Sequence, residues 1–130
     1  MSTIRVLVVE DFPAFRRFIT STLGERRDLH IIGVASDGPE GVQKAVELKP
    51  DLILMDIGLP TMNGIEAAQQ IRQLVPAAKI VFLSQESSAD VIQLALSTGA
   101  LGYVVKSKAG SQLIRALDAV NLGKQFVSSP

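Results

Sequence analysis

Short apolar runs alternate with longer segments of helical periodicity along the chain. Four runs are predominantly apolar, as strands covered on both faces of a sheet are; they are residues 4–9, 52–55, 80–83 and 102–105. Residues 30–35 form a weaker fifth run. Between the runs, apolar residues recur at the spacing of one helix face, as Phe15, Phe18 and Ile19 do. The alternation predicts an α/β fold with five strands in a doubly wound parallel sheet and helices on both of its faces.

Residues that start and stop helices fall between these segments. Pro13 suits the first turn of a helix, Asp37 with Gly38 and Pro39 suits the start of the next, and Gly99 stands where a C-terminal glycine belongs. Periodicity is lost from residue 121 onward. We therefore expect one domain over residues 1–124 and a C-terminal tail over residues 125–130.

Composition narrows the class of protein without identifying it. The 130 residues suit a single domain, and 13 basic against 13 acidic residues leave no overall basic field of the kind that marks a nucleic-acid binder. The absence of cysteine excludes a disulfide framework, a thiol nucleophile and a Cys-ligated metal site. No apolar run approaches the ~20 residues of a membrane span, and the N-terminal sequence does not have the layout of a signal peptide. We expect a cytoplasmic protein with no membrane partner.

Polar residues stand at the ends of four of the predicted strands. They are Glu10 and Asp11 after the first, Asp56 after the third, Ser84 after the fourth and Lys106 after the fifth. Taken singly, Asp11 could cap a helix, Ser84 could satisfy nearby backbone and Lys106 could be solvated. In an open parallel sheet, however, chemistry gathers beyond the carboxyl ends of the strands. The coincidence of four strand ends therefore favours a site.

The residue types at this edge point to a hard cation. Three carboxylates in one cleft raise each other's pKa unless a cation lies between them, and ligands that are all oxygen suit Mg²⁺. With one Mg²⁺ and Lys106, the charges sum to zero. A phosphoryl group on Asp56 would replace one negative charge by about two, and a hydroxyl such as that of Ser84 would be drawn toward it.

Four segments resemble the receiver domain of two-component response regulators, and together they span nearly the whole chain. They are VLVVED (6–11), DLILMDIGLPTMNGIEA (51–67), IVFLS (80–84) and GYVVKS (102–107). The segments KSKAGSQLIRAL and GKQFVSSP are similar to regulators whose receiver precedes a LuxR-type helix-turn-helix domain. The resemblance implies a flavodoxin-like fold with strand order 2-1-3-4-5. It also implies that residues 125–130 begin a linker to an effector domain absent from this chain.

The resemblance implies a role for each acidic residue at the strand ends. Asp56 would be the phosphoacceptor. Mg²⁺ would be the cofactor, held by Glu10, Asp11, Asp56 and the backbone carbonyl of Gly58. Asp11 would bind it directly and Glu10 through water. Lys106 would pair with a phosphoryl oxygen.

The resemblance also implies a switch and a set of partners. Ser84 would meet the phosphoryl group, and Tyr103 would point inward or outward with the phosphorylation state. A sensor histidine kinase would be the donor, and the face formed by the fourth helix and the fifth strand would control an output. That output is expected to be transcription, through a DNA-binding domain outside this chain, and a homodimer on activation is a further expected partner. The domain would be a phosphoacceptor switch that assists its own phosphorylation and dephosphorylation, not an enzyme.

This sequence departs from the family pattern at a few positions. Leu59 replaces a frequent Met, and Gln85, Glu86 and Gly58 occupy variable positions near the reacting phosphate, which leaves the lifetime of a phosphoryl group open. Ser107 stands where many members have proline, and the family often has a cis bond there. A cis bond at Ser107 would be a costly non-proline one.

Other functions remain as alternatives. A Mg²⁺-dependent phosphohydrolase with an aspartyl nucleophile would need a DxD motif after the first strand, where this chain has Glu10-Asp11-Phe12-Pro13. A flavin mononucleotide site would be repelled by Glu10 and Asp11. A receiver-like module that never becomes phosphorylated would normally lack part of the polar set. The apolar residues of the fourth helix, 91–96, fit either a broad buried face or a patch for a partner.

Overall fold

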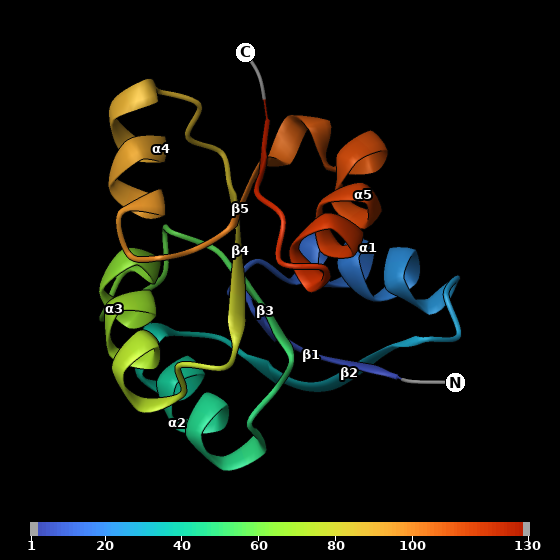
Figure 1. Cartoon of the computed structure of the whole chain (residues 1–130), viewed down its shortest axis with the longest axis horizontal. Helices are drawn as coiled ribbons and strands as arrows, with labels where there is room; N and C mark the ends of the chain where they lie inside the picture. Colours follow the sequence, from blue (N-terminus) through green and yellow to red (C-terminus); the bar gives the residue numbers. More distant parts are fainter. Residues whose placement is uncertain (1–2, 129–130) are drawn as a thin grey trace.

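The computed structural model describes residues 3–128, in which a parallel sheet lies between two layers of helices (Figure 1). Its strands are β1 (Ile4–Val9), β2 (Leu29–Ala35), β3 (Leu52–Met55), β4 (Lys79–Ser84), β5 (Gly102–Val105) and β6 (Phe126–Val127). Its helices are α1 (Pro13–Gly24), α2 (Gly38–Leu48), α3 (Gly64–Leu74), α4 (Ala89–Leu96), the 3₁₀ turn η1 (Lys106–Lys108) and α5 (Ala109–Asn121). The predicted alternation of strands and helices is confirmed.

The strand order is β2-β1-β3-β4-β5-β6, so the predicted order of the first five strands is confirmed and the count of five is one short. Phe126 and Val127 pair in parallel with Gly102 and Tyr103, within the segment that the sequence predicted as a tail. Two residues are too few to show the alternation by which a strand is recognised. The pairing uses backbone groups on the open edge of β5, which would otherwise face solvent.

Alternate residues of each central strand face opposite layers. On one face, Leu7 and Val9 of β1 pack with α2, α3 and α4, and on the other, Val6 and Val8 pack with α1 and α5. Figure 1 shows the sheet nearly edge-on between these layers. Burial on both faces explains why the strands read as continuous apolar runs and not as alternating ones.

Two of the helix starts that the sequence marked are confirmed, one by a side-chain hydrogen bond and one by a proline. Asp37 accepts a hydrogen bond from the Glu40 N–H at the start of α2, and Pro13 occupies the first turn of α1. The peptide bonds of residues 3–128 are all trans, including the bond between Lys106 and Ser107, whose isomer the sequence left open. None of the helices in the described part of the chain combines the length and apolarity that a membrane span requires.

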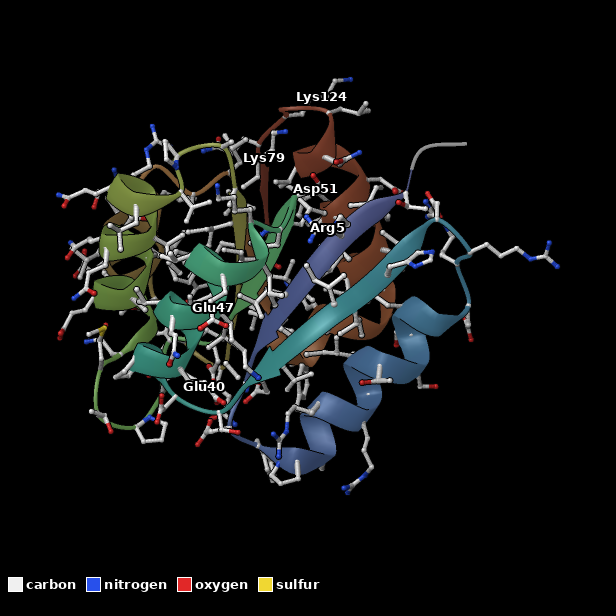
Figure 2. All side chains as sticks on the ribbon, turned by 90° about the horizontal axis from the view of Figure 1, so that it is seen from below. Arg5, Glu40, Glu47, Asp51, Lys79 and Lys124 are labelled. Atoms are coloured by element: carbon white, nitrogen blue, oxygen red, sulfur yellow. The ribbon has the colours of Figure 1, made fainter. Side chains whose placement is uncertain are left out.

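Arg5 joins three segments at the end of the sheet where β1 and β3 begin. Its backbone N–H donates to Asp51 Oδ2 at 2.8 Å, and its guanidinium donates to the carbonyls of Leu48 and Lys49 at 2.7 and 2.8 Å. Figure 2 shows Arg5 beside Asp51 in this region. The carbonyls that end α2 are thereby satisfied by a cation, which is the partner that helix C-termini favour.

Candidate functional site

The carboxyl ends of β1, β3, β4 and β5 surround an open pocket of about 370 Å³. It is lined by Asp11, Phe12, Asp56, Ile57, Gly58, Ser84, Gln85, Glu86 and Lys106. The structure thus brings together the strand-end residues that the sequence singled out, with Glu10 buried beneath them at 1% exposure. Gln85 and Glu86 line the pocket, near the reacting position where the sequence placed them, and Phe12 lines it although no role was predicted for this residue.

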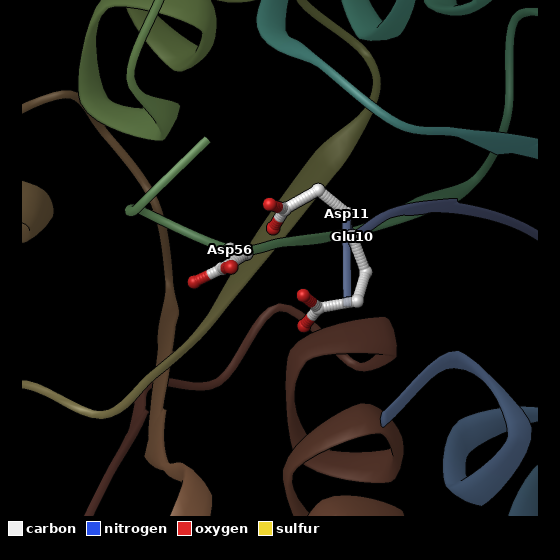
Figure 3. Close-up of side chains that lie close together, drawn as sticks. All are labelled: Glu10, Asp11 and Asp56. Carbon is white, nitrogen blue, oxygen red and sulfur yellow. The ribbon is translucent and has the colours of Figure 1, made fainter. Parts of the chain in front are cut away.

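Three carboxylates converge at this edge (Figure 3). Oxygen atoms of Glu10, Asp11 and Asp56 lie within 4.8 Å of one another, and Asp56 is only 7% exposed. The residue that caps α1 is Phe12, and among residues 3–128 no side chain hydrogen-bonds to the first turn of α1 as a cap. The alternative reading of Asp11 as a helix cap is therefore wrong, and its carboxylate is free to face the pocket.

Lys106 is the cation that this structure places among the carboxylates. Its Nζ lies 2.8 Å from Glu10 Oε1 and 3.4 Å from Asp56 Oδ2, and its side chain is 9% exposed. Burial raises the pKa of Glu10, and the charge of Asp56 adds to this, whereas the hydrogen bonds from Lys106 and from the Phe12 N–H oppose it. Three carboxylates against one ammonium leave about two negative charges, which a divalent cation would neutralise.

The backbone around Asp56 is held from both sides. Its N–H donates to the Val9 carbonyl at 3.0 Å, and its Oδ1 accepts a hydrogen bond from the Gly58 N–H at 3.3 Å. The Gly64 N–H donates to the Ile57 carbonyl at 2.8 Å, which draws the start of α3 so close that a methyl group on Gly64 would overlap the Asp56 carbonyl oxygen. The carboxylate therefore projects from a fixed position at the end of β3.

Ser84 and Tyr103, the two predicted switch residues, are linked through Glu86. The Glu86 N–H donates to Ser84 Oγ at 3.1 Å, and the Tyr103 hydroxyl donates to the Glu86 carbonyl at 2.7 Å. Both Ser84 and Tyr103 are buried, and burial raises the pKa of the Tyr103 hydroxyl. Tyr103 therefore lies inward here, bonded to the loop that follows β4.

The apolar residues of α4 divide between the two readings that the sequence left open. Ala95 is buried and packs in the core, while Leu94 is 54% exposed. Ile92 and Leu96 are partly buried against the same core. Part of the helix thus serves packing, and Leu94 is presented to solvent.

Residues 6–118 match the family model described as the response regulator receiver domain. The chain belongs to this family. Domains of the family are phosphoacceptor switches and bind Mg²⁺ at an acidic pocket, which here corresponds to the cluster of Glu10, Asp11 and Asp56. The recognition made from the sequence motifs is confirmed.

This receiver domain is similar to curated transcriptional regulators. It is 37% identical over 126 residues to the transcriptional regulatory protein LiaR of Bacillus subtilis. The matched region covers 97% of this chain and 60% of LiaR. It is 32% identical over 123 residues to the nitrate/nitrite response regulator protein NarL of Escherichia coli, covering 95% of this chain and 57% of NarL. The chain therefore spans less than two thirds of the length of these relatives.

A solved structure supports the same assignment. The two-component response regulator of the LuxR family from Aurantimonas sp. SI85-9A1 superposes with a TM-score of 0.93 at 32% identity, over 99% of this chain and 91% of that one. The similarity extends beyond α5, so it includes the segment of β6 that the sequence had predicted as a tail.

Proposed function

We propose that Asp56 accepts a phosphoryl group from the phosphohistidine of a sensor kinase, in a reaction that depends on Mg²⁺. The observation that carries the proposal is the position of Asp56: a nearly buried carboxylate that lines the pocket, 3.4 Å from the Lys106 ammonium and clustered with two further carboxylates. Because the donor is a sensor kinase, the proposal includes a cytoplasmic location.

The donor set fits Mg²⁺ in kind and in charge. Glu10, Asp11 and Asp56 would hold the ion, and the Gly58 carbonyl would complete the protein ligands. All of these ligand atoms are oxygens, and the surplus of about two negative charges matches a divalent ion. When bound, the ion supplies electrostatic stabilisation of the negative charge that develops on the phosphoryl oxygens.

In the proposed step, a carboxylate oxygen of Asp56 attacks the phosphorus atom in line with the P–N bond of the phosphohistidine. The P–N bond breaks, its electron pair stays on the histidine nitrogen, and the new O–P bond makes an aspartyl phosphate. The charge on Asp56 rises from one negative to about two. Lys106, already 3.4 Å from Asp56 Oδ2, is within reach of a phosphoryl oxygen.

The product would then rearrange the switch residues. The Ser84 hydroxyl now accepts a hydrogen bond from the Glu86 N–H, and the phosphoryl group would draw this side chain toward Asp56, where its O–H would donate to a phosphoryl oxygen. That change would disturb the loop to which Tyr103 is bonded and so alter the α4–β5 face. The output we propose is transcription, through a DNA-binding domain outside this sequence, with a homodimer formed on activation. The similarity to LiaR and NarL supports this.

The test is covalent labelling of the intact chain. With Mg²⁺ and a small phosphodonor, we expect one acid-stable, base-labile phosphoryl adduct per molecule by intact-mass spectrometry, and much slower labelling when the metal is chelated. Asp56→Asn should give no adduct, while Asp90→Asn, which changes an exposed carboxylate on α4, should label like the parent. Equal labelling of Asp56→Asn and the parent contradicts the proposal. Continuous turnover of a phosphate ester would support the phosphohydrolase alternative.

A further inference from the structure

The ammonium of Lys106 lies over the face of an aromatic ring as well as beside two carboxylates. Its Nζ is 4.7 Å from the centroid of Phe15, on the first turn of α1. The carboxylate contacts are to Glu10 at 2.8 Å and Asp56 at 3.4 Å. With its side chain 9% exposed, Lys106 has exchanged most of its hydration for two anions and one ring face.

The Phe15 ring is itself held in place. Its centroid lies 5.2 Å from that of Phe18, with the planes tilted by 45°. The Phe15 N–H donates to the Phe12 carbonyl at 3.1 Å, and the Phe12 N–H donates to Glu10 Oε2 at 3.1 Å. The ring and the main ion-pair partner of Lys106 are therefore tied to the same turn of backbone.

We propose that Phe15 is a positioning residue that keeps the Lys106 ammonium at the pocket before a phosphoryl group reaches Asp56. A lysine carries a long stem with many rotamers, and rotamers that swing out to solvent are not competent to stabilise the product. The face of an aromatic ring attracts a cation, most strongly where water is excluded, and so favours the inward rotamers. The kinetic part of this proposal rests on the proposed function of Asp56.

Ordinary packing is the competing explanation, because Phe15 also packs against the core on the side of α1 and α5. The two explanations differ in what they require of the ring. Packing requires apolar volume, which Leu largely supplies. Positioning requires the negative face of the ring, which Leu lacks and which fluorination weakens without changing the shape of the side chain.

The first measurement is made on the free protein, without metal or phosphodonor. In the parent, we expect the NMR signals of the Lys106 ε-methylene protons to be displaced upfield by the ring current of Phe15. Phe15→Leu should return them to the ordinary lysine position, and Phe15→Tyr should restore the displacement. If the Lys106 signals are the same in the parent and in Phe15→Leu, the ring does not hold the ammonium and the proposal is wrong.

The second measurement is the rate of labelling by the small phosphodonor at saturating Mg²⁺. Phe15→Leu should label about three- to tenfold more slowly than the parent. Replacement of Phe15 by trifluorophenylalanine should also slow labelling relative to the parent. Phe15→Tyr should label at a rate close to that of the parent. In a Lys106→Met background, Phe15→Leu should have no further effect.

The matched control is Phe126→Leu. It removes another cation–π contact, in which the Arg115 guanidinium lies 5.6 Å from the Phe126 ring centroid and which does not involve Lys106. Phe126→Leu should leave the labelling rate unchanged. An equal loss in Phe126→Leu, or a full effect of Phe15→Leu in the Lys106→Met background, overturns the positioning role. If the parent does not label at all, the proposed function fails, while the Lys106 signals still decide whether Phe15 holds the ammonium.

Discussion

The hydroxyl of Tyr103 donates to the backbone carbonyl of Glu86 at 2.7 Å, across 17 positions of the sequence. The backbone N–H of Glu86 donates to Ser84 Oγ. One residue of the loop between β4 and α4 is thus bonded to both predicted switch side chains. A change at Ser84 therefore acts on the same residue whose carbonyl accepts the Tyr103 hydrogen bond.

Tyr103→Phe tests this link directly. The variant keeps the ring against Phe82, whose centroid is 6.3 Å away, and removes only the hydroxyl. We expect the free energy of unfolding to fall by about 1 kcal/mol, the usual effect of losing one hydrogen bond. Amide hydrogen exchange should speed up in the loop over residues 85–88 and remain unchanged in β1 and β3. Unchanged exchange in that loop contradicts the link.

Gly64→Ala should displace Asp56. The added methyl would overlap the Asp56 carbonyl oxygen, which belongs to backbone and cannot rotate away. We expect a loss of about 2–3 kcal/mol in the free energy of unfolding, measured by urea denaturation, and slower labelling of Asp56. Gly110→Ala, in α5, is the control: apart from its chain neighbours and the backbone of its own helix turn, the described part of the chain has no atom within 4 Å of the added methyl. The change should be neutral or stabilising by about 0.5–1 kcal/mol. Similar losses in the two variants would show that crowding at Asp56 is not the cause.

Thr61 adopts a backbone conformation that its side chain disfavours. Its φ is +70°, in the loop between Asp56 and α3, and left-handed backbone costs a residue with a side chain about 1–2 kcal/mol. Thr61→Gly should therefore raise the free energy of unfolding by about 0.5–1 kcal/mol after the larger chain entropy of glycine is subtracted. Thr61→Ser, which keeps a side chain, should stay close to the parent. If thermal denaturation shows that Thr61→Gly is no more stable than Thr61→Ser, backbone strain at this position is ruled out.

The ion pairs of Arg26 predict a pH-dependent part of the stability. Its guanidinium contacts Asp28 at 2.9 Å and Asp118 at 3.0 Å, which ties the end of α1 to the start of β2 and to α5. The hydrogen bond from Arg26 holds the pKa of Asp28 below its usual range. A carboxyl whose pKa is lower in the folded state stabilises the fold above its unfolded pKa of about 3.9, and this contribution is lost as the pH falls through the folded-state value.

The corresponding variant is Asp28→Asn. It should be less stable than the parent at neutral pH, and the difference should shrink as the pH is lowered from about 4. Urea denaturation at a series of pH values measures both. In an Arg26→Gln background, the pH-dependent difference should largely disappear. A difference that is constant from neutral to acid pH would show that Asp28 acts through packing and not through its charge.

The sheet and the site could be predicted from the sequence for one physical reason. Buried parallel strands are apolar on both faces, so they are visible as runs, and their carboxyl ends share one edge, so the residues that follow them must meet. Glu10, Asp56 and Lys106 were placed together on that argument, and they lie within ion-pair distance. This prediction required only that the strand ends share one edge of the sheet, and it did not require the individual side-chain contacts within the site.

The features that could not be predicted from the sequence depend on loop conformation and on single contacts, which produce no periodic pattern of apolar residues. β6 has only two residues, and it pairs with β5 through backbone hydrogen bonds, which any sequence can make. The bond from Tyr103 to Glu86 depends on how the loop after β4 turns. Phe15 was visible only as part of an apolar helix face, because the same spacing serves packing and contact with a cation.

Chemical mapping of the phosphoryl group decides whether Asp56 is the phosphoacceptor. After labelling with Mg²⁺ and a small phosphodonor, borohydride reduces an aspartyl phosphate to homoserine, which tandem mass spectrometry locates in the peptide. We expect homoserine at position 56 and unmodified side chains at Asp11 and Ser84. A phosphoryl group on any other residue, or homoserine at position 11 with Asp56 intact, would contradict it.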